Sequence, residues 1–338
     1  MASAALVAAL ATALVDVAAS LPAPLDRVPL SPILLAIVGG LALAPLARAQ
    51  AAWQPGLRTA AGPLLKFAVV LVGLRLSLAQ LGELGLQALP LAAGALSVGL
   101  ALAWGLGRLL GIGRSLVALL AVGTAVCGAS AIAATAPALR PRPEETGYAL
   151  ACVALFGLLA TLCYPWLLAA FLPDATLAGL VLGAAIHDTA QVTAAALLLE
   201  RALGEEGVLA AATVTKLLRN LGMLAVIPLV VWWARRGETR TGVSVPFPWF
   251  ILGFVAAAAL RTAGDFAFGS GASWSWWMEI ASSASAFLFA MAMAAIGMAI
   301  DLRALRALGW RPALVALGSA LAIGTLALGW AAWLAQRM

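Results

Sequence analysis

The chain has 338 residues, of which 64% are hydrophobic and only 10% are charged, with a mean hydropathy of +1.05. Because a soluble domain carries about 25% charged residues, this composition excludes an ordinary soluble protein and predicts one embedded in a lipid bilayer. The net charge of +6 comes from arginines that lie between apolar runs, a pattern that indicates membrane topology and excludes nucleic-acid binding.

Eleven apolar stretches follow one another along the chain, each treated as a crossing helix because a crossing needs about 20 apolar residues. They cover residues 2–21, 31–47, 63–81, 88–107, 115–137, 147–171, 177–199, 209–234, 247–264, 282–300 and 312–334. The loops between them are too short for a soluble domain, so residues 1–338 are predicted to form a single all-α, polytopic membrane unit. Residues 265–281, with three tryptophans, are expected to form an interfacial re-entry or an aromatic belt.

The ends of the chain and its charges give the expected orientation. Residues 1–21 are apolar without a basic start and are interpreted as a retained helix, although an A-x-A-like stretch near Ala18 also fits a cleaved signal. Ten basic residues fall on one side of the predicted spans and six on the other, which places the N-terminus in the cytoplasm and the C-terminus outside. The three cysteines, at 127, 152 and 163, lack metal-ligand spacing and are expected to be packing residues.

An internal repeat links two distant parts of the chain. VGLRLSLAQLGELGL at 72–86 is similar to IGMAIDLRALRALGW at 296–310, and this register gives ten identities over positions 73–106. The two copies lie in spans of opposite direction, so segments 63–107 and 282–334 are predicted to be inverted repeats, as in secondary transporters. A weaker match joins 123–136 to 183–196, although those two spans run in the same direction.

Two small-residue stretches carry the first candidate site residues. The core motif within 115–137 supplies Gly123, Thr124, Cys127, Gly128 and Ser130, where a helix can break and expose N–H groups to an anion. The alternative is a face on which helices pack closely.

The core motif within 177–199 contains His187, the only histidine, followed by Asp188, Thr189 and Gln191. A charge at membrane depth costs roughly 2.5–3.5 kcal/mol, so such residues usually serve a substrate, an ion or a proton. On a regular helix His187 and Gln191 share a face, while Asp188 points about 100° away. Asp188 is expected to carry Na⁺ or a proton; the alternative is a buried polar pair that only holds helices together.

Charged residues elsewhere in the spans complete the candidates. Lys216, Arg219 and Asn220 share one helical face and are predicted to oppose Asp188 or an anionic substrate, although Lys216 could instead reach the membrane surface. Arg75 is placed well inside a span, where helix carbonyls would satisfy it if its role is structural. Asp301 is expected to be an interfacial cap.

Three motifs follow one another along the chain: GTAVCGASAIAATAP, GAAIHDTAQV and ATVTKLLRN. Over roughly residues 30–335 the chain resembles a family of bacterial membrane proteins assigned as sulfate exporters, grouped with bile-acid/sodium symporters and sodium/proton antiporters. The resemblance implies a panel domain and a core domain of inverted repeats, in which two broken helices cross at the membrane midplane. It also implies a place in the bacterial inner membrane.

The expected function is secondary active transport of a small anion, such as sulfate, sulfite, a sulfonate or an organic acid, coupled to protons or Na⁺. A half-helix N-terminus contributes about half a charge, so a dianion would also need Lys216, Arg219 or protonated His187, and Arg219 is expected to point inward. No resident cofactor is expected, and a homodimer is left open. The alternatives are an intramembrane enzyme using His187 and Asp188, with Ser130 or Cys127 as nucleophile, and a structural or signalling membrane protein.

Overall fold

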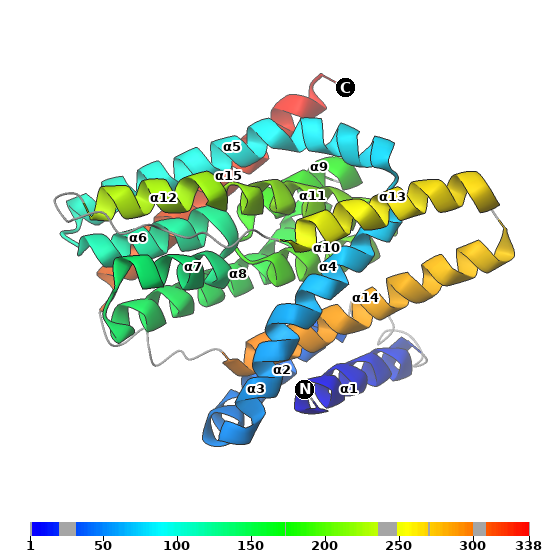
Figure 1. Cartoon of the computed structure of the whole chain (residues 1–338), viewed down its shortest axis with the longest axis horizontal. Coiled ribbons are helices and arrows are strands. Elements are labelled where there is room, and N and C mark those ends of the chain that lie inside the picture. The colour runs from blue at the N-terminus through cyan, green and yellow to red at the C-terminus, as the bar shows by residue number, and fades with distance from the viewer. Residues whose placement is uncertain are drawn as a thin grey trace. The chain divides into compact units, whose positions relative to one another are not determined.

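The computed structural model describes residues 2–19, 32–172, 174–235, 249–269, 271–299 and 309–337, and every regular element there is a helix (Figure 1). The α-helices are α1 (Ala2–Ala19), α2 (Pro32–Ala49), α3 (Gln54–Thr59), α4 (Leu65–Val72), α5 (Leu78–Leu109), α6 (Arg114–Val122), α7 (Ala129–Leu139), α8 (Pro143–Phe171), α9 (Ala175–Ala185), α10 (Thr189–Leu203), α11 (Val208–Leu221), α12 (Met223–Ala234), α13 (Phe250–Phe268), α14 (Ala272–Ala299) and α15 (Arg311–Ala335). Shorter helical turns are η2 (Ala51–Trp53), η3 (Ala60–Leu64), η4 (Gly73–Arg75) and η5 (Gly123–Cys127).

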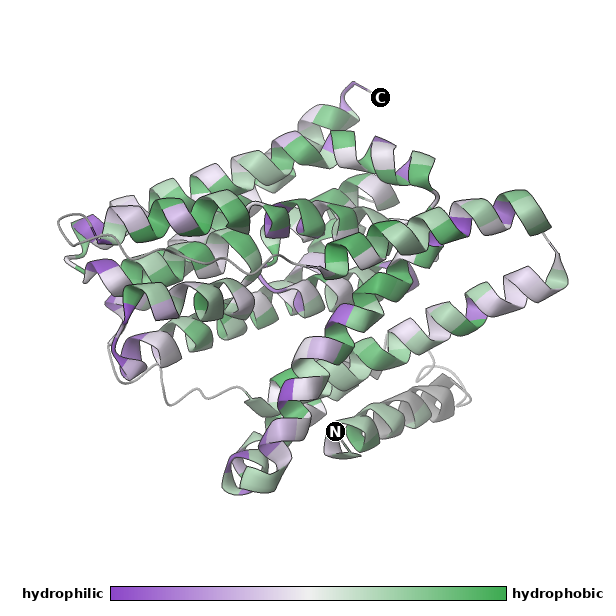
Figure 2. Cartoon of the chain, viewed as in Figure 1, coloured by the Kyte–Doolittle hydropathy of each residue, from purple (hydrophilic) through white to green (hydrophobic). Residues whose placement is uncertain are grey.

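The prediction of an all-α polytopic membrane protein is confirmed. Among the described residues, six continuous helices are long and apolar enough to cross a membrane, and the pair α11–α12, bent by 41°, makes a seventh. Apolar residues predominate along most of the helices drawn in colour (Figure 2). The predicted spans 115–137 and 177–199 are not continuous helices, because each is interrupted in its middle. Their shorter pieces are therefore not counted among the long crossing helices.

One compact unit comprises residues 1–82, 196–205 and 249–300. Its long helices α2 and α14 pack so closely that glycine is required at the contact. A Cβ on Gly40 would meet the Ala294 carbonyl, and one on Gly297 would lie 2.5 Å from the Ile37 carbonyl oxygen. The two glycines thus set the separation of the two backbones.

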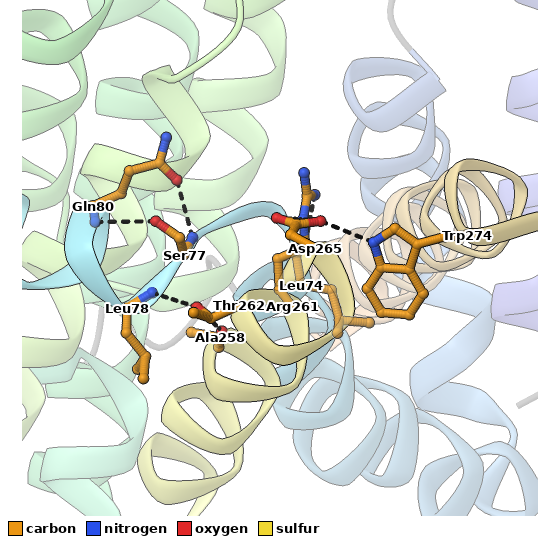
Figure 3. A network of polar contacts seen from close by, with 9 residues as sticks. All are labelled: Leu74, Ser77, Leu78, Gln80, Ala258, Arg261, Thr262, Asp265 and Trp274. Atoms are coloured by element: carbon orange, nitrogen blue, oxygen red, sulfur yellow. Dashed lines mark hydrogen bonds and ion pairs between the residues drawn. The ribbon is translucent and has the colours of Figure 1, made fainter. Parts of the chain in front are cut away.

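The same unit contains a break that the sequence interpretation placed inside a span. The predicted helix 63–81 ends with η4, Leu76 is extended, and α5 begins at Leu78. Ser77 and Gln80 cap this start reciprocally, with Ser77 N donating to Gln80 Oε1 at 2.9 Å and Gln80 N donating to Ser77 Oγ at 3.3 Å (Figure 3). This is the capping-box arrangement of a helix N-terminus.

Most of residues 265–281 is helical, because α13 continues to Phe268 and α14 begins at Ala272. The interfacial re-entry stays a prediction. Trp274, Trp276 and Trp277 lie in the first turns of α14, and the last two are exposed. The aromatic belt stays a prediction. Residues 300–308, which carry Asp301 and most of the matched segment 296–310, lie outside the described residues, as do residues 20 and 21. The inverted repeats stay a prediction.

The second compact unit comprises residues 83–195, 206–248 and 301–338. Within it α9 and α11 approach backbone to backbone. A Cβ on Gly179 would lie 2.6 Å from the Val208 carbonyl oxygen, and one on Gly183 would meet the Ala212 carbonyl. Helices α8 and α15 pack against α9, and α6, α8 and α15 pack against η5, where the buried side chains are mostly aliphatic. This packing holds the candidate site residues in place.

Candidate substrate and ion site

The first interruption in this unit lies at Gly128. Helix α6 passes into the wider turn η5, whose last closing bond runs from Gly128 N to the Gly123 carbonyl at 3.0 Å, and α7 begins at Ala129. Gly128 has φ +67° and ψ −128°, a conformation that is essentially restricted to glycine. A Cβ there would also lie 3.2 Å from Asp188 Oδ2. Gly128 therefore permits both the break and the close approach of Asp188.

The second interruption lies between α9 and α10. Ile186 is extended, with φ −85° and ψ 140°, and α10 begins at Thr189. Asp188 Oδ1 accepts a hydrogen bond from Ala190 N at 2.9 Å, as an N-cap aspartate does. The prediction that His187 and Gln191 share one regular helical face is wrong, because the chain leaves the helix at residue 186 and starts a new one at 189.

Arg219 on α11 is fully buried and joins the two interruptions. Its guanidinium donates to carbonyls from both broken segments at 2.5–3.4 Å, namely those of Thr124, Ala125, Gly183, Ala184 and Ile186. The prediction that Arg219 points inward is confirmed. These partners are backbone carbonyls at the carboxyl ends of η5 and α9, where a helix carries negative partial charge.

Lys216, one turn earlier on α11, is also fully buried. Its ammonium donates to the Val126 carbonyl at 2.9 Å, to the Ile186 carbonyl at 3.0 Å and to the His187 carbonyl. The alternative in which Lys216 reaches the membrane surface is therefore wrong. Because both cations bond to both segments, residues 123–130 and 183–191 lie close together, as their mid-span glycines and hydroxyls predicted.

Other polar side chains around the breaks are partly satisfied. Gln191 Nε2 donates to the Ala154 carbonyl at 3.1 Å, and Asn220 Nδ2 donates to Thr189 Oγ1 at 3.3 Å. Among the described residues, His187 Nδ1, Gln191 Oε1 and Asn220 Oδ1 are buried without a hydrogen-bond partner. Buried polar atoms are normally paired, so these three atoms have bonding capacity for a water, ion or substrate.

The predicted site residues differ in accessibility. Gly123, Thr124, Cys127 and Gly128 are buried, and the Thr124 hydroxyl already donates to the Leu120 carbonyl at 2.8 Å. In contrast, Ser130 is exposed, and Asp188 and Thr189 are partly exposed. The accessible part of the site is thus formed by the first residues of α7 and α10 together with Asp188. Both helices present their N-termini there, the ends with positive partial charge.

Two features of the first unit escaped the sequence interpretation. Arg75 lies at the end of η4 and pairs with Glu200 at 3.3 Å. The expectation that helix carbonyls satisfy it is wrong, since the helix stops at that residue. Arg261 pairs with Asp265 at 2.7 Å and donates to the Leu74 carbonyl at 3.1 Å (Figure 3). The spacing of four between Arg261 and Asp265 was an available signal.

The helices and their two adjacent interruptions define a multi-pass, all-α membrane protein. The sequence profile of the family described as Conserved hypothetical protein 698 matches residues 4–316, and the chain belongs to this family. It is 33% identical over 242 residues to a UPF0324 membrane protein of Bordetella bronchiseptica, which covers 69% of this chain and 74% of that relative.

Two further relatives extend the comparison. A UPF0324 membrane protein of Streptococcus agalactiae is 33% identical over 243 residues, covering 71% of each chain. One of Agrobacterium fabrum is 33% identical over 301 residues, covering 89% of this chain and 83% of that relative. The predicted membership of a conserved bacterial membrane family is confirmed, while the sulfate exporter assignment and the wider superfamily stay predictions.

Proposed function

We propose that the protein is a secondary active transporter of a small anion and that Asp188 is the group that couples transport to an ion gradient. The observation that carries this proposal is the charge balance at the two interruptions. Lys216 and Arg219 are buried beside one carboxylate, that of Asp188. The four half-helix ends cancel among themselves, so these three side chains leave one net positive charge.

An uncompensated charge in a buried site is costly, and a bound anion removes that cost. A proton or a Na⁺ ion at Asp188 would each raise the net charge to two, so either one increases the need for a bound anion. The charge balance therefore favours an anionic substrate, and the proton is the coupling ion that we propose. Broken helices whose N-termini meet beside a carboxylate also suit transport, since secondary transporters bind anionic groups at such ends.

The enzyme alternative receives less support. Within the described residues, no hydrogen bond joins the His187 side chain to Ser130 or Cys127, the two candidate nucleophiles. Ser130 is exposed and Cys127 is buried, so they do not present one shared surface with His187. A nucleophile that acts with a histidine base needs such a hydrogen bond.

The test is transport by the purified full chain in liposomes. Uptake of sulfate, sulfite, sulfonates and carboxylates would be measured against separate proton and Na⁺ gradients. We expect uptake of at least one anion to follow the proton gradient, and Asp188→Asn to lose this coupling while staying folded. Absence of movement of every anion under every gradient would end the transporter proposal.

A matched control comes from another helix cap of the same unit. Asp174 caps α9, where its Oδ1 accepts from Leu177 N at 2.7 Å, and it is exposed. Asp174→Asn therefore changes the same chemical group at a helix N-terminus away from the interruptions. We expect it to keep wild-type coupling. Equal loss in both variants would assign the effect to helix capping and not to the site.

A further inference from the structure

We propose that the site keeps a constant total charge, so that the number of protons bound with an anion depends on the charge of that anion. A monoanion binds while Asp188 is ionised and brings no proton. A dianion binds together with one proton on Asp188. This inference rests on the proposed transport function and specifies its coupling rule.

Some charges at the site can change when an anion binds, and others are fixed. Arg219 is effectively always protonated, and the Lys216 nitrogen donates to three carbonyl oxygens, which match the three N–H donors of an ammonium, whereas a neutral amine has two. Both are fully buried and bonded to backbone, so neither can turn away from the site or be exchanged for water. The two cations therefore supply a fixed charge, against which only Asp188 and the bound anion vary.

The other titratable groups around Asp188 are few. His187 precedes it, Cys127 lies on η5, and α8 carries Cys152 and Tyr148, whose hydroxyl donates to the Gly309 carbonyl at 2.5 Å. A neutral thiol or phenol has no site for a further proton, and a proton on the imidazole of His187 is disfavoured because that side chain is buried beside two cations. Asp188, which is partly exposed, is therefore the group that takes up a proton when a second negative charge arrives.

A bound anion would also lie close enough to the Asp188 carboxylate to repel it electrostatically. The Asp188 carboxylate caps α10 through Ala190 N and approaches Gly128 at the start of α7. An anion at these same N-termini lies beside the carboxylate, and two like charges that close disfavour each other. The second charge of a dianion thus promotes protonation of Asp188, whereas the single charge of a monoanion is already balanced by the cationic excess.

The experiment compares sulfate with methanesulfonate, two tetrahedral sulfur oxyanions that differ in charge by one. Binding to the purified full chain would be measured by titration calorimetry in buffers of different ionisation enthalpy, which reports the number of protons taken up. We expect sulfate to bind one proton more than methanesulfonate. Between about pH 6 and about pH 8, sulfate affinity should fall about tenfold per pH unit, while methanesulfonate affinity stays flat.

Succinate and its monoamide form a second pair that applies the same comparison to carboxylates. In Asp188→Asn the proton difference should vanish for either pair, and Asp174→Asn should retain it. Loss of the difference in Cys127→Ser would assign the proton to the thiol and overturn the role of Asp188. Equal proton numbers for dianion and monoanion in the wild-type chain would overturn the inference while leaving anion transport intact. If no anion binds or enters liposomes, the transport proposal fails and this inference with it.

Discussion

Two arginines, one in each unit, donate to backbone carbonyls at helix ends, but only one of them also pairs with a carboxylate. Arg261 in the first unit and Arg219 in the second unit each donate to carbonyls at the end of a helical segment. Arg261 also pairs with Asp265 at 2.7 Å, and both side chains are about one-third exposed, at 33% and 39%. Arg219 is completely buried, and its guanidinium donates to backbone carbonyls.

The difference separates a structural arginine from one that sets the charge of a site. The carboxylate beside Arg261 neutralises it locally, so that cluster contributes little beyond holding α13, η4 and α14 together (Figure 3). Lys216 and Arg219 outnumber the one carboxylate beside them. Keeping an excess positive charge in a buried site is expensive, and the proposed binding of an anion would offset that cost.

The largest expected effect is the loss of stability on substituting Arg219. Arg219→Gln removes the donors to carbonyls of both interruptions, and each buried carbonyl left without a partner costs about 1–3 kcal/mol. We expect the free energy of unfolding to fall by more than about 3 kcal/mol, measured by thermal unfolding in detergent. Arg261→Gln is the matched control and should cost about 1 kcal/mol or less, because its ion pair is partly exposed. Equal losses would remove the distinction between the two arginines.

The next effect tests how tightly the second unit holds the start of α10. A Cβ on Gly157 would meet the Gln191 side-chain amide, so Gly157→Ala should destabilise the protein by about 1–3 kcal/mol through overpacking. Gly147 lies on the same helix, α8, with nothing within 4 Å of an added Cβ. Gly147→Ala should therefore be neutral or stabilising by about 0.5–1 kcal/mol. Thermal unfolding of both variants decides this, and a loss at Gly147 as large as that at Gly157 would refute the packing argument.

Two neutralising substitutions, at Lys216 and at Asp188, test the charge balance of the site through anion binding. Lys216→Met removes one buried cation while keeping much of the side-chain volume, so the site loses its positive excess. We expect methanesulfonate affinity to fall at least about tenfold, or about 1.4 kcal/mol. Adding Asp188→Asn restores the net charge of one, so the double variant should recover affinity by calorimetry and show no pH dependence. A double variant that binds no better than Lys216→Met would show that specific contacts outweigh net charge.

The smallest effect belongs to the neutralised cluster. Trp274 Nε1 donates to Asp265 Oδ1 at 2.8 Å, and Trp274→Phe removes this bond but keeps an aromatic ring. We expect a loss of about 1 kcal/mol or less in stability and no change in anion binding. A change in binding comparable to that of Lys216→Met would mean that the first unit contributes to the charge balance of the site.

The sequence predicts the breaks well because they depend on local chemistry. Gly128 and the pair His187–Asp188 stand out in otherwise apolar stretches, and the structure interrupts the helices there. The sequence does not predict what Lys216 and Arg219 bind, because every residue has a backbone carbonyl and none is marked as a partner. Those carbonyls become available only where the two distant breaks meet.

The position of Arg75 was missed for a different reason. Residues 74–78 are mostly apolar and read as a continuous span, although Ser77 followed by Gln80 matches the capping box of a new helix. The number of crossing helices was likewise set by hydropathy, which does not distinguish an interrupted segment from a continuous one. Local capping signals were thus more informative than hydropathy where the two disagreed.

The close contact of α2 with α14 through Gly40 and Gly297 has a consequence for biosynthesis. Helix α14, which packs against this face of α2, is made only after residues 50–271 have been synthesised. At about 5–20 residues per second, this delay is on the order of tens of seconds. During that time the small-residue face of α2 has no native partner and must be shielded by lipid or by the insertion machinery. The membrane therefore receives an incomplete first unit, whose assembly ends only when α14 arrives.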